Sequence, residues 1–379
     1  MAKLGPARLA MAINTLGTGG VPEAVLGLTR HLPRDRFDPR LYVMRPPLDP
    51  AAAEAMAARF EQAGIPVVIA PPGDGKLGSV AQMADWLAEA RIDILHSHSF
   101  RPNLYARLAG VLGRQGGLRM IAQYHNQYDD KWTEGSYALG LERHLAQTTD
   151  AMIAVSGAVR DHVAARLLVD PGRVDVVLNG IDPDKVRDCD RDAARQALGL
   201  RADDLAIGCI GRVCRQKGQD LFVQAALALL HRMPRAQFLI IGSPEDAAMT
   251  DALTRRIADA GAADRIRFLG HRPDIAPIYR ALDVLAAPSR WEGFGLMLAE
   301  AMAAGCAVVA AAVGAIPEVT AGAAVLVPPD DPEALAEALA GLDGPTRQAM
   351  QARGMIRARA FGWEQAAAEV SAIYDRVLA

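Results

Sequence analysis

Short runs of apolar and β-branched residues recur along the chain, separated by turn signals or amphipathic stretches. Seven runs come first: LAMAIN, RLYVM, PVVIA, DILHS, MIAQY, AMIAVS and VDVVLN. Six more follow: LAIGCIG, AQFLIIG, RIRFLG, DVLAAPS, AVVAA and AVLVPP. Between several of them, as at residues 80–90 and 101–112, the spacing is that of an amphipathic helix. Strands alternating with helices predict parallel, doubly wound α/β sheets, which bind ligands beyond the carboxyl ends of their strands.

The two series of strands predict two domains, because 379 residues exceed one ordinary core. The polar segment VLNGIDPDKVRDCDRDAARQALGL between them has the composition of a linker, and we place the boundary near Pro183. We expect domains over residues 1–183 and 184–360, facing one another across a cleft. Residues 361–379 read as an amphipathic helix.

Composition narrows the class of protein and its compartment. The chain is 51% hydrophobic and 22% charged, which is typical of a folded soluble protein, and a net charge of −3 gives no general attraction to nucleic acid. Four cysteines without C-x-x-C spacing favour a reducing compartment and no structural zinc. Neither the N-terminus nor the run Ala301–Pro317 is apolar enough for a signal peptide or a membrane span. We therefore expect a cytoplasmic protein.

The stretch PSRWEGFGLMLAEAMAAG, residues 288–305, places Glu292 and Glu300 on either side of a predicted helix start. Unpaired N–H groups at such a start favour a phosphate, and Gly293 and Gly295 let the backbone approach a ligand. The two carboxylates could then reach different parts of one ligand. A solvated helix start would have a similar pattern, but the tryptophan and the two glycines favour a site.

The stretch IGRVCRQKGQD puts Arg212 and Lys217 directly after a buried strand. Two cations in this loop could neutralise a diphosphate, the arginine as a fork and the lysine as a point charge. Ordinary surface cations in a solvated loop are the alternative.

The first half of the chain has two further candidates. The loop NTLGTGG leads into a helix but lacks the G-x-G-x-x-G register and a P-loop lysine, so a packing role competes with ligand binding. His96, His98 and His125 follow or end strands. Because no third ligand has suitable spacing beside the first two, we do not expect a metal site there.

Together these stretches resemble the GT-B-fold retaining glycosyltransferases of family 4, also called glycosyltransferase group 1. The resemblance runs through nearly the whole chain, in order. Its motifs are the glycine loop at Gly17–Gly20, DILHSHS, His125 with Asn126, IAVSGAVRDHV, VLNGID, IGRVCRQKGQD, FLIIG, IRFLGHRPDI, APSRWEGFGLMLAEAMAAGCAVV and FGWEQAAAEVSAIY. It implies two Rossmann-like domains facing a cleft and a C-terminal helix that returns to the N-terminal domain.

The resemblance also implies roles for single residues. Arg212 and Lys217 would grip the donor diphosphate, Glu292 would face the donor sugar, and Glu300 would hold the ribose hydroxyls. The remaining donor contacts would come from Gly19, Gly20, Gly242, Arg272, Gly293, Phe294, Gly295 and Leu296, with Arg272 and its neighbour His271 near the nucleobase. His125 would sit beside the sugar on the acceptor side. Arg212, Lys217, Glu292 and His125 are thus the predicted catalytic residues.

Two positions depart from the family pattern. Pro22 occupies the usual acidic position of the glycine loop, with Glu23 one residue later, and Gly242-Ser243-Pro244 lacks a second glycine. The acceptor-side chemistry of the first loop and the donor contacts of the second are therefore open.

The implied function is transfer of a sugar, with retention, from a nucleotide sugar for which UDP-hexose is favoured. The acceptor is open: a lipid-linked or other cell-envelope glycan, or a small molecule. No metal or other cofactor is expected, because two cations and a helix terminus face the diphosphate. The alternatives are an epimerase or hydrolase of sugar nucleotides with the same fold, and a non-catalytic nucleotide-sugar-binding protein.

A carboxylate-free stretch between Asp93 and Asp129 carries four arginines: Arg101, Arg107, Arg114 and Arg119. One interpretation is a solvated helix face over a buried stripe. The other is a patch that binds weakly to an anionic membrane, at about 1 kcal/mol per basic residue, on the inner face of the cell membrane.

Overall fold

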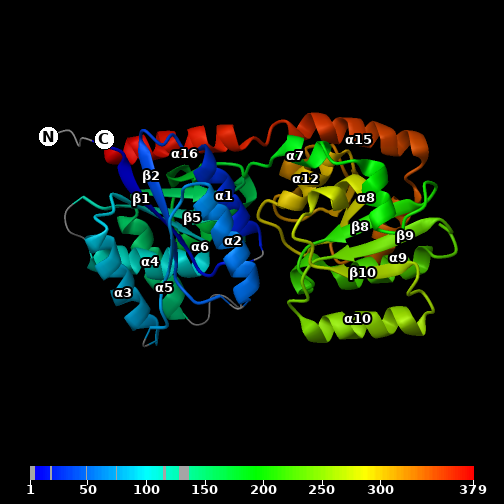
Figure 1. Cartoon of the computed structure of the whole chain (residues 1–379), viewed down its shortest axis with the longest axis horizontal. Coiled ribbons are helices and arrows are strands. Elements are labelled where there is room, and N and C mark those ends of the chain that lie inside the picture. Colours follow the sequence, from blue (N-terminus) through cyan, green and yellow to red (C-terminus); the bar gives the residue numbers. More distant parts are fainter. Residues whose placement is uncertain (1–4, 18, 48, 74, 114–116, 128–135) are drawn as a thin grey trace. The chain divides into compact units, whose positions relative to one another are not determined.

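The computed structural model describes residues 5–17, 19–47, 49–73, 75–113, 117–127 and 136–379. The chain divides into two compact units, which Figure 1 colours from blue to red along the sequence. The N-terminal unit comprises Met1–Gly180 and Trp363–Ala379, and the C-terminal unit comprises Ile181–Gly362. The domain limits expected from the sequence, at residues 183 and 360, differ from these observed limits by two or three residues.

The N-terminal unit is built on a parallel sheet of order β3-β2-β1-β4-β5-β6-β7. Its strands are β1 (Ala7–Ile13), β2 (Phe37–Val43), β3 (Val67–Ile69), β4 (Ile94–His98), β5 (Arg119–Tyr124), β6 (Ala151–Ala154) and β7 (Val174–Val176). Its helical elements are α1 (Gly20–His31), α2 (Pro50–Gln62), α3 (Gly75–Glu89), α4 (Phe100–Leu112), α5 (Ser136–Thr148), α6 (Gly157–Leu167), η2 (Pro171–Arg173) and α16 (Trp363–Leu378).

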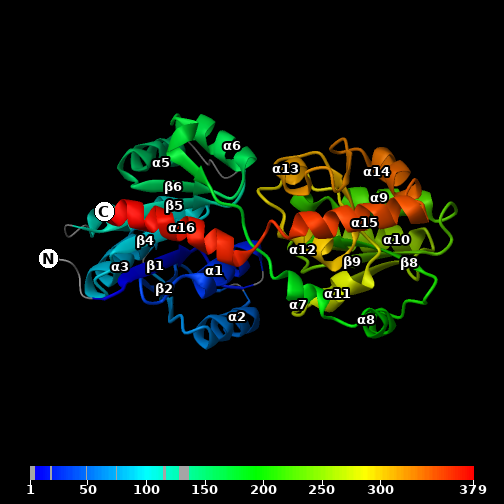
Figure 2. The same cartoon turned by 90° about the horizontal axis from the view of Figure 1, so that it is seen from above.

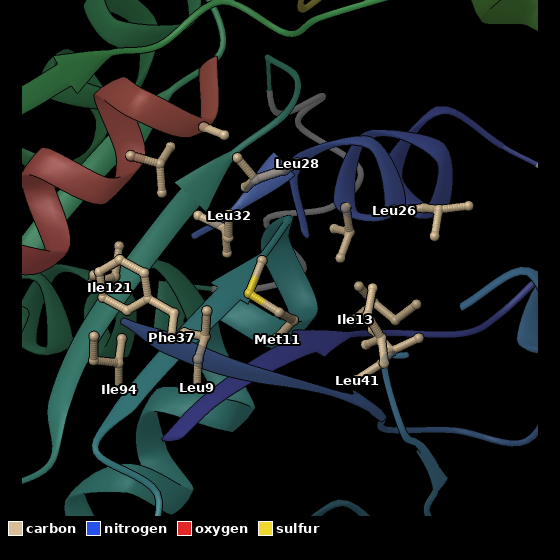
Figure 3. Close-up of a cluster of buried hydrophobic side chains, with 14 of the residues drawn as sticks. Leu9, Met11, Ile13, Leu26, Leu28, Leu32, Phe37, Leu41, Ile94 and Ile121 are labelled. Atoms are coloured by element: carbon tan, nitrogen blue, oxygen red, sulfur yellow. The ribbon is translucent and has the colours of Figure 1, made fainter. Parts of the chain in front are cut away.

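Both faces of this sheet are covered, so its strands are apolar on both sides. On one face Leu9, Met11 and Ile13 of β1 pack with side chains of α1, β2, β4 and β5, as Figure 3 shows. Ala10 and Ala12 point to the opposite face, where the core is formed with α3 and α4. This alternation within one strand explains why LAMAIN reads as a continuous apolar run.

The C-terminal helix α16 packs on the same face as α1, within the N-terminal unit (Figure 2). Its first residue, Trp363, lies so close to Gly27 and Gly180 that a Cβ at either glycine would overlap the indole. Near its end, Tyr374 is fully buried and meets Phe37 edge to face at 5.1 Å. The expected return of this helix to the N-terminal domain is therefore observed.

The C-terminal unit repeats the topology, with a parallel sheet of order β10-β9-β8-β11-β12-β13. Its strands are β8 (Leu205–Ile210), β9 (Ala236–Ile241), β10 (Ile266–Gly270), β11 (Val284–Ala287), β12 (Ala307–Ala311) and β13 (Val325–Val327). Its helical elements are α7 (Pro183–Arg187), α8 (Arg191–Ala197), η3 (Arg215–Lys217), α9 (Gln219–Leu229), α10 (Ala247–Asp259), α11 (Ala276–Ala281), α12 (Leu296–Ala304), α13 (Ile316–Thr320), α14 (Pro332–Ala340) and α15 (Gly344–Ala358). The predicted α/β class with two doubly wound sheets is confirmed, and each of the thirteen apolar runs overlaps a strand.

The segment predicted to be a linker contains two short helices, α7 and α8. Asp182 and Asp190 cap α7 and α8 by accepting hydrogen bonds from backbone N–H groups. Arg195 of α8 then reaches Asp283, with 3.1 Å between Nη1 and Oδ2. Polar composition suggested a linker here, but aspartate caps and long-range ion pairs anchor the segment in the C-terminal unit.

The expectation of an exposed arginine patch is wrong at Arg107. This side chain is fully buried between α4 and α5, where it donates to Thr149 Oγ1 at 2.8 Å and lies 3.4 Å from Glu142 Oε1. Arg119 forms an ion pair with Asp150 at 3.3 Å. The stretch lacks carboxylates in sequence, but the fold supplies them from later segments, and a buried charge needs such a partner. Arg101 is half-buried, and Arg114 lies outside the described residues.

Within the described ranges, no helix combines the length and the apolar character needed to cross a membrane.

Candidate active site

In the C-terminal sheet the strand order reverses between β8 and β11, which pair directly. Open α/β sheets bind ligands at such a switch point, beyond the carboxyl ends of the strands. The loop after β8 carries Arg212 and Lys217, and the loop after β11 carries Glu292. The topology therefore brings three of the predicted residues, far apart in sequence, to one edge of one sheet.

Lys217 and Glu292 form an ion pair at this edge. Both side chains are largely buried, at 15% and 6% exposure. Ser289 Oγ donates to the same Glu292 oxygen at 3.2 Å, and Met297 Sδ lies 3.9 Å from the ammonium group. The lysine charge is thus held in one place by a partner that is itself hydrogen-bonded, as a preorganised cation requires.

Arg212 has a different environment. It forms an ion pair with Glu245, and the two side chains are 42% and 48% exposed. Glu245 belongs to the loop after β9 that begins at Gly242. Gly242 has a φ of 152° and lies so close to the Gly211 carbonyl that any side chain would overlap it. Close packing against Gly211 therefore requires a glycine at position 242, whether or not Gly242 also has its predicted role in donor binding.

The two loops at the switch point are tied together. Gln216 Nε2 donates to the Trp291 carbonyl at 3.0 Å, and the Arg290 N–H donates to the Gln216 carbonyl at 2.8 Å. The Arg290 guanidinium donates to both carboxylate oxygens of Asp220, at 2.9 and 2.7 Å. A bidentate pair of this kind fixes orientation as well as distance, so it holds the segment of Lys217 against that of Glu292.

Helix α12 begins directly after Gly295, which has a φ of 81° and no side chain to cap the first turn. The predicted residues Gly293 and Phe294 thus lie in the turn that leads into the helix, Gly295 is its N-cap, and Leu296 is its first residue. Phe294 itself is buried and packs edge to face on Phe361 at 5.5 Å. Its side chain anchors the turn, so a ligand contact would come from its backbone.

Glu300 lies in the second turn of α12 and accepts a hydrogen bond from the Tyr279 hydroxyl at 2.7 Å. Tyr279 comes from α11, which follows the loop with His271 and Arg272. Both loop side chains are exposed. They follow β10, the edge strand two places from β8, so they lie away from the switch point of the sheet.

In the N-terminal sheet the order reverses between β1 and β4. Gly19 precedes α1 with a φ of 152°, and Gly20 opens the helix. Pro22 fits the first turn, where a missing N–H costs no helical bond. Glu23 is paired with Arg59 of α2, with 2.8 Å between Nη2 and Oε2, so this carboxylate ties two helices together.

Three histidines lie at the ends of β4 and β5. The His98 and His125 rings approach to 3.0 Å between Nδ1 and Nε2, and the His96 and His98 rings stack with centroids 4.2 Å apart. His96 Nδ1 is 2.6 Å from the Tyr374 hydroxyl. Burial lowers the pKa of His96 to about 3 and that of His125 to about 4, and it holds the pKa of His98 well below its ordinary value. All three are therefore neutral at pH 7.

A small cavity lies beside these histidines, with room for about one water molecule. Its lining includes His98, Gln123, His125, Asn179 and Trp363. Within the described residues, His98 Nε2 and Gln123 Oε1 are buried without a hydrogen-bond partner. Among the residues that the structure describes, no group of three or more His, Cys, Asp or Glu side chains is arranged so that it could hold a metal ion.

Sequence reasoning missed several residues that hold the site of the C-terminal unit together: Gln216, Tyr279, Ser289 and Arg290. Ser289 and Arg290 lie inside a recognised motif, so their position was a usable signal. Tyr279 lies outside every recognised motif, because it meets Glu300 only through the fold.

The sheet orders and the site define the class of protein. The structure matches that of Anabaena HepE, solved in complex with UDP and glucose, with a TM-score of 0.84 at 20% identity over 98% of this chain and all of the other. At this identity the likeness concerns the fold, which is GT-B. Residues 18–185 match Glycosyltransferase Family 4 and residues 204–342 match Glycosyl transferases group 1.

Two relatives are more similar in sequence. The lipopolysaccharide core biosynthesis mannosyltransferase LpsB of Rhizobium meliloti (strain 1021) is 39% identical over 63% of this chain and 69% of its own. D-inositol 3-phosphate glycosyltransferase 1 of Catenulispora acidiphila is 34% identical over 74% of this chain and 72% of its own. The chain belongs to the family 4, group 1 glycosyltransferases.

Proposed function

We propose that the protein transfers a hexose from a nucleoside-diphosphate sugar, with UDP favoured, to a hydroxyl group of a cell-envelope glycan, with retention of anomeric configuration. The observation that carries the proposal is the ion pair of Lys217 and Glu292 at the switch point, beside the start of α12. This arrangement suits a diphosphate that must gain negative charge as it leaves.

In the proposed reaction the bond from the anomeric carbon to the distal phosphate oxygen breaks, and its electron pair leaves with the nucleoside diphosphate. The acceptor oxygen bonds to the anomeric carbon on the same face. Because Glu292 is engaged by Lys217 and Ser289, we assign the acceptor proton to the departing phosphate oxygen. Lys217 and Arg212 offset the developing charge, and one such group contributes roughly 2.7–4 kcal/mol.

The remaining assignments follow the same proposal. Glu300 holds the ribose, the turn at residues 293–296 binds the distal phosphate, and His125 binds a sugar hydroxyl as a neutral imidazole. A neutral ring suits that task, since a cation there would compete for the diphosphate. With two cations assigned to the leaving group, the reaction needs no metal.

Two comparisons support the choice of sugar and acceptor. The name of LpsB describes a mannosyltransferase of lipopolysaccharide core synthesis, and HepE was crystallised with UDP and glucose. Both fit a hexose donor, and LpsB fits an envelope glycan.

Product analysis tests the proposal. The protein is incubated with UDP-glucose, UDP-galactose or GDP-mannose, with and without truncated lipopolysaccharide core as acceptor, and the first-formed product is examined by NMR. We expect acceptor-dependent release of the nucleotide and a retained anomeric configuration. An inverted product would contradict retention. Acceptor-independent sugar release would indicate a hydrolase, isomerised donor an epimerase, and binding without turnover a non-catalytic protein.

A further inference from the structure

Tyr279 is a buried tyrosine of the C-terminal unit whose hydroxyl contacts Glu300. Its side chain is 1% exposed, and its hydroxyl lies 2.7 Å from Glu300 Oε2. A buried phenol requires a hydrogen-bond partner. Burial raises the pKa of Tyr279 well above its ordinary value, and the Glu300 carboxylate raises it further. The phenol therefore keeps its proton and is the donor.

The backbone of Tyr279 is fixed on several sides. Its carbonyl accepts from the Leu282 N–H at 3.2 Å and from Cys306 Sγ at 3.2 Å. The next residue, Arg280, donates to the Ala304 carbonyl at the end of α12 at 3.0 Å. Helix α11 is thus tied to the helix that carries Glu300, so the phenol meets the carboxylate from a defined direction.

The two carboxylates of the site are held in different ways. Glu292 is held by a cation, Lys217, which neutralises it. Tyr279 contributes a hydrogen bond to Glu300 and no charge. A carboxylate oriented by a neutral donor keeps its strength as an acceptor, which is what a pair of neutral hydroxyl groups on a ligand requires.

We propose that Tyr279 is a positioning residue for ribose recognition: by holding Oε2 of Glu300, it presents the carboxylate to both hydroxyls of a ribose and so selects ribonucleotides over 2′-deoxyribonucleotides. The proposal rests on the proposed function, because it takes Glu300 as the ribose contact. Tyr279 lies outside the recognised motifs, and the chemical feature that it helps to select is a vicinal diol.

Calorimetric titration with UDP, GDP and their 2′-deoxy forms tests this inference. The wild type should bind one of the two ribonucleotides about tenfold more tightly than its deoxy form, as expected for one hydrogen bond to a charged group. Tyr279→Phe should reduce this ratio to within about twofold, and Glu300→Gln should do the same. The double variant should match Glu300→Gln alone, since Tyr279 acts through Glu300.

The ratio is measured within each variant, so a lower yield of folded protein does not change it. Tyr42→Phe is the matched control: it removes another buried phenol, packed on Trp86 in the N-terminal unit, and should keep the wild-type ratio. If Tyr279→Phe keeps the full ratio while Glu300→Gln loses it, the inference is overturned and the ribose assignment stands. If Glu300→Gln also keeps it, or if the wild type binds neither UDP nor GDP, the site assignment of the proposed function fails as well.

Discussion

The N-terminal and C-terminal units share one order over six strands, to which the N-terminal sheet adds β7, but they carry different chemistry near the point where that order reverses. In the N-terminal unit the strand ends hold His96, His98 and His125, packed on one another and neutral. In the C-terminal unit they hold Lys217 and Glu292 as an ion pair. The topology thus selects the place of a site, and the residue types select the ligand: neutral rings suit sugar hydroxyls, whereas fixed charge suits a diphosphate.

Removal of the Lys217 ammonium group should have the largest effect on activity. Lys217→Ala should lower kcat by about 100- to 1000-fold, because in the proposed reaction the lysine charge offsets that of the leaving diphosphate. Steady-state kinetics with saturating donor measures this. Lys185→Ala, which removes an exposed lysine of the same unit, is the control and should keep the wild-type rate. An unchanged kcat in Lys217→Ala, with the fold verified by circular dichroism, would rule out the assigned role.

Acid should destabilise the N-terminal unit selectively, because its buried histidines resist protonation. The folded pKa of His96 is about 3, below the value of about 6.5 in the unfolded chain, so the unfolded state takes up the proton first. The stability present above pH 6.5 is therefore lost as the pH falls towards 3. Between pH 7.5 and 5.0 the loss should be about 2 kcal/mol for His96 alone.

Pulse proteolysis in urea, with fragments identified by mass spectrometry, can follow each unit. The midpoint of the N-terminal unit should fall with pH, and His96→Gln should weaken that dependence. His231→Gln, which alters an exposed histidine of the C-terminal unit, should leave it unchanged. A midpoint independent of pH over this range would refute the account of neutral, buried histidines.

A smaller effect is expected at the exposed ion pair of the C-terminal unit. Glu245 is paired with Arg212, so under the proposed assignment it competes with the diphosphate. Glu245→Gln should then tighten donor binding by up to about threefold, in line with the low value of exposed pairs. The gain should shrink at high salt, because exposed charges are screened. Titration at two ionic strengths measures it, and weaker binding would show that Glu245 serves the donor directly.

Chelation should have no effect. Since two cations are assigned to the diphosphate, activity should survive EDTA. Loss of activity that manganese or magnesium restores would mean that the charged residues do not suffice.

The sequence predicted features that depend on neighbouring residues but not contacts between residues far apart in the chain. Alternation and turn signals located every strand, because they depend on neighbours along the chain. The placement of Lys217 and Glu292 after strands was likewise visible, since strand ends in parallel sheets share one edge. Their pairing was not, because they are 75 residues apart and meet only once β8 and β11 are adjacent.

The same limit explains the error at Arg107. Helical spacing showed which residues share a face with it but not that α5 covers that face with Glu142. Tyr279 is similar, since only the packing of α11 on α12 brings it to Glu300. Long-range partners therefore had to come from the structure.

The seat of Trp363 against Gly27 and Gly180 has a consequence for biosynthesis. Translation is vectorial, so the ribosome makes the whole C-terminal unit between Gly180 and Trp363. During that interval the nascent N-terminal unit lacks both Trp363 against the two glycines and Tyr374 in its apolar core. The N-terminal unit can therefore be completed only after the whole C-terminal unit has been synthesised, when α16 becomes available to pack on it.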